Sequence, residues 1–227
     1  MTDFTASLDW WGLLEFAAMV TGLVYVILEI KKTRRMWHWM IVSSICNGFV
    51  FAHKGFLSMT LIQFYYIITA IYGIITWTRV VKTAQAKYGP VHHKEVAIVP
   101  FNRRRALCSI VLALVVFCVL AALSARVYVP ATGDVPGKPY WDSAVAVLSM
   151  LATYWLSQSW YAQWYVWVAV NLAAIVMFLY PVFTGHPEVA LPLMGVLYVL
   201  YMISTVVGMI NWKKNGVIIV PSKSPEK

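Results

Sequence analysis

Residues 160–171 read WYAQWYVWVAVN and lie inside a long run without charged residues. A helix turns by about 100° per residue, so four of these residues fall on one narrow face: Trp160, Trp164, Trp167 and Asn171. An unpaired amide is costly in hydrocarbon, so this face is expected to look into a protein cavity. The same residues also fit an aromatic belt at a membrane interface with one hydrogen bond between helices.

The composition is that of a polytopic membrane protein. Hydrophobic residues make up 61% of the 227 residues and charged residues 12%, with a mean hydropathy of +0.71. The net charge of +9 does not indicate nucleic-acid binding, because the basic residues sit in short loops beside hydrophobic segments. The acidic N-terminus lacks a basic region, so we expect no cleaved signal peptide. The cysteines lack metal-ligand spacing, and we expect no cofactor and no metal.

Seven segments are long enough, or nearly so, to span a bilayer at about 1.5 Å per residue. We expect them at residues 10–30, 36–53, 56–78, 106–127, 141–159, 161–181 and 189–212. The fifth and sixth come from the uncharged stretch 143–187, with a tight turn near residues 157–162. We interpret Asp142 as the N-cap of the fifth segment.

The Lys and Arg residues predict the orientation. They cluster after the first, third and seventh segments and before the fourth: Lys31, Lys32, Arg34, Arg35, Arg79, Lys82, Lys87, Lys94, Arg103, Arg104, Arg105, Lys213, Lys214, Lys223 and Lys227. The other side of seven spans carries only Lys54, Arg126 and Lys138. By the positive-inside rule, we expect the N-terminus outside and the C-terminus in the cytoplasm.

The third and seventh segments share a pattern at identical offsets. It consists of Gln63, Tyr66, Ala70, Gly73 and Trp77 in the third segment, and Tyr198, Tyr201, Thr205, Gly208 and Trp212 in the seventh. One segment earlier, Asn47 matches Asn171. The pattern predicts an all-α membrane protein of two parallel three-helix repeats, 1–80 and 129–215, joined by a linking helix at 106–128. A cytoplasmic loop, 81–105, and a cytoplasmic tail, 216–227, complete the predicted division. We interpret the glycines as close-packing positions, and Trp77 and Trp212 as interface anchors.

The candidate binding site is the polar and aromatic layer that this arrangement places near mid-membrane. By depth it contains Asn47, Gln63, Tyr66, Asn171, Tyr198 and Tyr201, with Trp167 and Trp164 one and two turns closer to the cytoplasm. Amides and aromatic faces suit a polar, ring-containing molecule that is neutral or cationic, such as a nucleoside, whereas an anion would be unpaired. Glu15 and Glu29 are expected near the ends of the first segment. The absence of acids at mid-depth favours a facilitator over a proton-driven pump, and sodium coupling through carbonyls stays open.

Other function classes fit less well. The histidines His38, His53 and His186 lie near segment ends without metal-ligand spacing, so an enzyme is not expected. A retinal receptor needs a lysine within the last segment, which has none before Lys213. A seven-helix ligand-sensing receptor remains an alternative.

The sequence resembles the PnuC family of bacterial nicotinamide riboside transporters. The resemblance lies in the W-x-x-W-x-x-x-N run, in the helix that follows it and in a weaker first-half copy: Trp164, Trp167, Asn171, Tyr201, Gly208, Trp212, Asn47, Tyr66, Gly73 and Trp77. It implies a 3+1+3 fold similar to the SWEET sugar transporters, and a homotrimer in the bacterial inner membrane. It also implies uptake of nicotinamide riboside by facilitated diffusion, with trapping by a cytoplasmic riboside kinase. The loop 183–191 is longer than its first-half counterpart, and thiamine remains an alternative cationic substrate.

Overall fold

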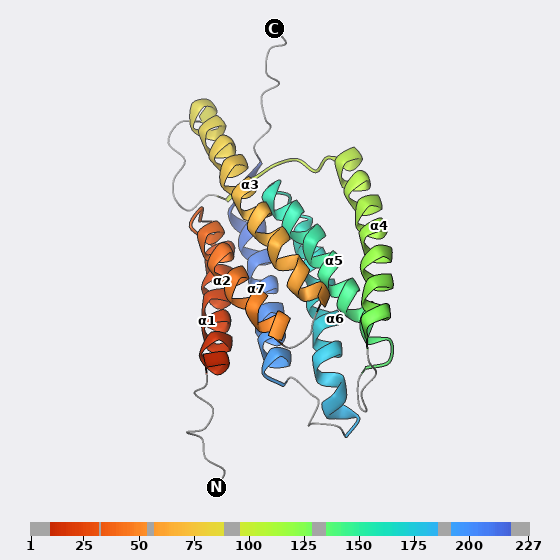
Figure 1. Ribbon diagram of the computed structural model, residues 1–227. Helices are drawn as coiled ribbons and strands as arrows, with labels where there is room; N and C mark the ends of the chain where they lie inside the picture. The colour runs from red at the N-terminus through yellow and green to blue at the C-terminus, as the bar shows by residue number, and fades with distance from the viewer. Residues whose placement is uncertain are drawn as a thin grey trace.

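The computed structural model describes residues 10–31, 33–53, 57–88, 96–128, 135–185 and 192–218. These residues form seven α-helices and two short β-strands (Figure 1). The elements are α1 (Trp10–Ile30), α2 (Met36–His53), α3 (Leu57–Tyr88), β1 (Val96–Ile98), α4 (Arg103–Val127), α5 (Lys138–Ser157), α6 (Gln163–Phe183), α7 (Pro192–Asn215) and β2 (Gly216–Ile218). The prediction of an all-α protein with seven helices is confirmed, and the two strands are only three residues long. The arrangement as two parallel repeats stays a prediction.

The helix boundaries follow the sequence closely, with two differences. The helix α3 continues past the predicted end at residue 78 as far as Tyr88, so part of the predicted loop is helical. The interpretation of Asp142 as an N-cap is wrong, because α5 begins earlier, with Gly137 as its N-cap. Asp142 lies inside the helix and is buried. The predicted turn near residues 157–162 separates α5 from α6.

Within the described part of the chain, five helices contain stretches long and apolar enough to cross a membrane: α1, Ser58–Arg79 of α3, α4, α6 and Gly195–Asn215 of α7. The other two are shorter or more polar. In α5 the polar residues face protein, because Ser143, Ser149 and Thr153 are all buried. Such small side chains let neighbouring helices approach closely. That α2 and α5 also span stays a prediction.

The helices pack in two groups with the same internal order. The helix α2 packs against both α1 and α3, and α6 packs against both α5 and α7. The groups meet where α3 packs against α5 and where α7 packs against α1. The helix α4 packs against α5 and forms the right edge of the bundle in Figure 1. The third helix of each group therefore contacts the first helix of the other.

One end of the bundle carries the ends of α1, α3 and α7 and the start of α4 (top of Figure 1). The strands β1 and β2 pair in parallel at this end, with Ala97 opposite Val217. The Val99 amide donates to the Ser159 carbonyl at 3.1 Å, in the turn between α5 and α6. The segment before α4 is thereby joined to the second helix group.

Candidate functional site

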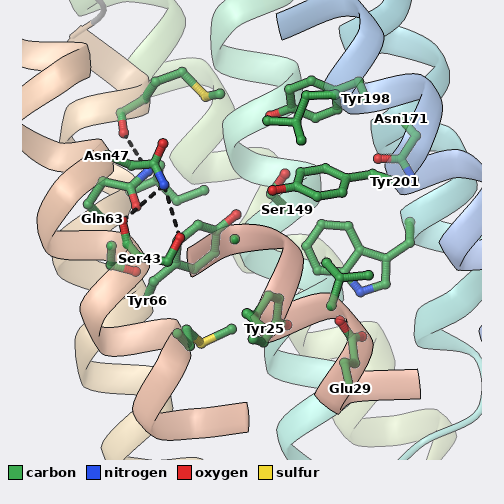
Figure 2. A pocket seen from close by; sticks show the side chains of 18 of the residues that line it. Tyr25, Glu29, Ser43, Asn47, Gln63, Tyr66, Ser149, Asn171, Tyr198 and Tyr201 are labelled. Carbon is green, nitrogen blue, oxygen red and sulfur yellow. Dashed lines mark hydrogen bonds between the residues drawn. The ribbon is translucent and has the colours of Figure 1, made fainter. Parts of the chain in front are cut away.

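A cavity lies between the two helix groups, and Figure 2 shows many of the side chains that line it. All eight residues predicted as a binding site line this one cavity: Asn47, Gln63, Tyr66, Trp164, Trp167, Asn171, Tyr198 and Tyr201. They come from α2, α3, α6 and α7. The structure thus brings the predicted set together, and its role in binding stays a prediction.

On the α2–α3 side, two amides hold their NH₂ groups against their own helices. Asn47 Nδ2 donates to the Ser43 carbonyl at 2.9 Å and to Ser43 Oγ at 3.1 Å, and Gln63 Nε2 donates to the Met59 carbonyl at 3.0 Å. No hydrogen bond from the described residues is directed at the amide oxygens. These oxygens can therefore accept hydrogen bonds from a ligand.

Across the cavity, Asn171 is held by the neighbouring helix. Its Nδ2 donates to Thr205 Oγ1 at 2.9 Å, and this hydroxyl donates to the Tyr201 carbonyl at 2.8 Å. The side chain is 2% exposed, so a free donor here would be costly. The amide is fixed in orientation by α7 before any ligand binds.

The aromatic rings form two packed pairs along α7. The rings of Tyr198 and Tyr201 meet edge to face, with centroids 5.6 Å apart. The ring of Trp164 meets Trp212 in the same manner, with centroids 5.4 Å apart. A Cβ atom at Gly208 would collide with the Trp164 ring, so only glycine leaves room for it. The packing fixes the cavity wall on this side.

The expected ladder of three tryptophans is wrong at its first position. Trp160 precedes α6 and is buried against Phe101 and Trp155, with ring centroids 5.1 Å and 6.1 Å away. The helical face of residues 160–171 starts only at Gln163, because the turn between α5 and α6 occupies the residues before it. Trp164 and Trp167 remain on the cavity.

The interpretation of Trp77 and Trp212 as interface anchors is also wrong. They are 4% and 0% exposed inside the bundle. Trp77 meets Trp37 edge to face at 5.2 Å, as Trp212 meets Trp164. The close packing predicted for the glycines is confirmed, because a Cβ at Gly73 would lie 2.5 Å from the Trp37 ring.

The helix α1 contributes a lining face that the sequence interpretation did not assign to the site. Gly22, Tyr25, Val26 and Glu29 all line the cavity. Their spacing is that of one helical face, which is the sequence signal that could have found them. A Cβ at Gly22 would lie 2.5 Å from Tyr201 Oη, so the glycine lets this hydroxyl approach α1 closely.

Glu29 changes the electrostatics expected for the site. Glu29 lies in the last turn of α1, as expected from the sequence. The cavity extends along α1 as far as this turn, so Glu29 lines it. It is 4% exposed. Among the described lining residues it is the only Asp or Glu, and none is Lys or Arg. The cavity wall is therefore neutral except for one potential negative charge.

Comparisons with known proteins agree with this architecture. A family model described as nicotinamide mononucleotide transporter matches residues 12–214. Two proteins named nicotinamide riboside transporter PnuC, from Escherichia coli (strain K12) and Shigella flexneri, are each 22% identical over 176 residues, which cover 73% of this chain and 73% of theirs.

A crystal structure of the vitamin B3 transporter PnuC shares the fold. Its TM-score is 0.66 at 22% sequence identity, and the match covers 93% of this chain and 84% of that one. The resemblance stated from the sequence is confirmed by these matches, and five helices are apolar enough to cross a membrane. The chain therefore belongs to the nicotinamide mononucleotide transporter family, that of PnuC, and is a multi-pass membrane transporter and not an enzyme.

Proposed function

We propose that this chain carries nicotinamide riboside into the bacterial cytoplasm by facilitated diffusion, and that a cytoplasmic riboside kinase traps it there. The observation that carries the proposal is the cavity in which amides and aromatic rings from four helices meet. The relatives from E. coli and S. flexneri are named for the same substrate.

The chemistry of the lining matches the parts of this molecule. Nicotinamide riboside has a positively charged pyridinium ring, a carboxamide and ribose hydroxyls. The amide oxygens of Asn47 and Gln63 can accept from hydroxyl or carboxamide donors. The rings of Trp164 and Trp167 offer faces for the flat cation.

The same lining argues for the riboside against the mononucleotide in the family description. A phosphate needs cationic or N–H donors, for which Arg and Lys are the usual side chains. The described lining residues include neither, and Glu29 adds a negative charge. A phosphorylated product would bind poorly and would not leak back.

Uncoupled transport is proposed because the described residues at the middle of the cavity include no acid, and because Glu29 lies at one end of it. In liposomes, purified protein should transport the riboside down its gradient without an imposed proton or sodium gradient. Uptake that appears only with one of these ion gradients would contradict facilitated diffusion.

The main alternative is another cationic aromatic vitamin such as thiamine, since the lining suits any flat cation. A seven-helix ligand-sensing receptor is the alternative class, and it predicts binding without uptake. Competition between thiamine and labelled riboside, measured with the liposome assay, separates these cases.

We also propose that the fold is a 3+1+3 repeat, with units 1–80 and 129–215 joined by the linking helix 106–128. The loop 81–105 and the tail 216–227 complete this division. Support comes from a repeated packing unit: Trp37 lies over Gly73 against Trp77, and Trp164 lies over Gly208 against Trp212. Support also comes from the matching helix contacts of the two groups.

The proposed location is the bacterial inner membrane, with the N-terminus outside and the C-terminus in the cytoplasm. The basic residues at the ends of α1, α3 and α7 and at the start of α4 support this orientation. A cysteine introduced at Lys213 should react with an impermeant maleimide only in permeabilised cells.

A homotrimer is proposed from the family resemblance, and the mass of the purified complex tests it.

A further inference from the structure

A buried acid and a buried hydroxyl face the cavity from α1, apart from the amides discussed above. Glu29 and Tyr25 both line it, one helical turn from each other, and Figure 2 shows them together. Glu29 Oε1 and Tyr25 Oη are buried, and neither is within hydrogen-bonding geometry of a described residue, although the two side chains are close enough to interact with each other. The carboxylate thus has the Tyr25 hydroxyl as a neighbour and no described lining cation beside it, which leaves its charge for a ligand to balance.

The position of Glu29 along the cavity follows from contacts between α1 and α7. Tyr201 Oη lies beside Gly22, and Asn211 Nδ2 donates to the Ile30 carbonyl at 2.7 Å. The two helices therefore run alongside each other in the same direction, with Glu29 close to the level of Gly208. Glu29 follows Gly22 by seven positions, a rise of roughly 10 Å at about 1.5 Å per residue.

Trp164 lies at this same level, because its ring packs directly over Gly208. Asn171 lies about two helical turns further along α6, near Thr205. The cavity therefore has two levels. One contains the amides, and the other contains an acid, a phenol and an indole ring.

A carboxylate removed from water is stable as an anion only beside a positive charge or hydrogen-bond donors. The described lining provides no Lys or Arg for this purpose. An aromatic face also attracts cations. We propose that Glu29, Tyr25 and Trp164 form a subsite for the positively charged ring of the substrate, at the end of the cavity nearer the basic loops.

This inference rests on the proposed function, since it assigns the cationic part of that substrate to one level of the cavity. The ribose then extends toward the amides at the other level. The subsite favours a cationic ring over a neutral ring, because only the cation is attracted electrostatically to the carboxylate.

Two ligand pairs that differ in charge test the subsite on the purified, full-length protein. The first is nicotinamide riboside and its reduced, neutral form. The second is 1-methylnicotinamide, a cation, and neutral nicotinamide, both without ribose. In Glu29→Gln the dissociation constant of each cation should rise about tenfold or more, while that of each neutral partner should change less than twofold. Glu29→Asp, which keeps the charge, should recover part of the cation affinity.

Asp142→Asn is the matched control, because Asp142 is a second buried acid and is not among the described lining residues. It should leave the cation-to-neutral ratio as in the wild type. Retained binding of the neutral ligands shows that Glu29→Gln is folded. Equal losses for cations and neutral ligands, as expected if Glu29 only pairs with the basic loop 31–35, would overturn the subsite. Unchanged cation affinity would overturn it too.

A different measurement would contradict the proposed function. If the wild type neither binds nor transports the riboside, that assignment is lost. The second ligand pair still measures the charge preference of the cavity, and an unchanged ratio in Glu29→Gln for that pair would overturn the subsite by itself.

Discussion

Asn171 shows how one side chain is prepared for a ligand by its neighbours. Thr205 holds its NH₂ group at 2.9 Å, which leaves the amide oxygen oriented by α7. Replacing it with Ala should remove one hydrogen bond to the ligand and leave a ligand donor unmatched. We expect riboside affinity to fall by about 1–3 kcal/mol, roughly tenfold to a hundredfold.

Titration of the purified Asn171→Ala variant checks this value. Asn47→Ala is the comparison, with a smaller expected loss, because the two tryptophans that line the cavity, Trp164 and Trp167, lie in the second half of the chain. A well-folded Asn171→Ala variant with wild-type affinity would assign this amide to helix packing alone.

Trp167 should act through its ring face. Leu in its place keeps apolar bulk and loses the π system, so the cationic riboside should lose about 0.5–2 kcal/mol of binding free energy. The neutral, reduced riboside should lose less, which titration of both ligands measures. Equal losses would reject a cation–π contact, and no loss for either ligand would remove Trp167 from the site.

At this scale the sequence could predict a large part of the site. The eight polar and aromatic residues could be selected because helical spacing and depth are both readable from the chain, and all line one cavity. Glu29 was missed as a lining residue because a depth count assumes that the site lies at mid-membrane. It cannot reveal how far a cavity extends along α1.

Among the elements, α7 depends on Gly208 for its contact with α6. A Cβ there would collide with the Trp164 ring, which is wedged against Trp212. Gly208→Ala should therefore cost about 1–3 kcal/mol of stability and displace a wall of the cavity. We expect a lower melting temperature and weaker riboside binding for the purified variant.

Gly48→Ala in α2 is the matched control. Its Cβ would lie 3.6 Å from Gln63 Cβ, an ordinary contact, and alanine favours a helix over glycine. Its melting temperature should equal or exceed that of the wild type. If Gly208→Ala were as stable as Gly48→Ala and bound the riboside normally, the packing argument for α7 would be wrong.

The helices themselves were predictable, and their inner faces were less so. The bounds of α1 and α2 coincide with the predicted segments because charged residues and low apolarity mark their ends. The predictions for Trp77 and Trp212 are wrong because a tryptophan near a helix end has the same sequence pattern at a lipid interface as in a core. Only the partner rings, such as Trp37 and Trp164, distinguish the two.

For the whole molecule, the central feature is a cavity bounded by both helix groups. It is lined by α1, α2 and α3 of one group and by α5, α6 and α7 of the other, so neither group forms the site alone. The repeated offsets in the sequence predicted two similar units. They could not predict how the units face each other, since that depends on contacts such as Asn211 to Ile30 and Tyr201 beside Gly22.

The most direct test of the central claim is a calorimetric titration of the purified protein with three ligands: nicotinamide riboside, its phosphorylated form and thiamine. The riboside should bind saturably at one site per chain. The phosphorylated form should bind at least a hundredfold more weakly, about 2.7 kcal/mol, because the described lining residues offer its phosphate no cation. Equal or tighter binding of the phosphorylated form, or binding of thiamine without binding of the riboside, would contradict the account.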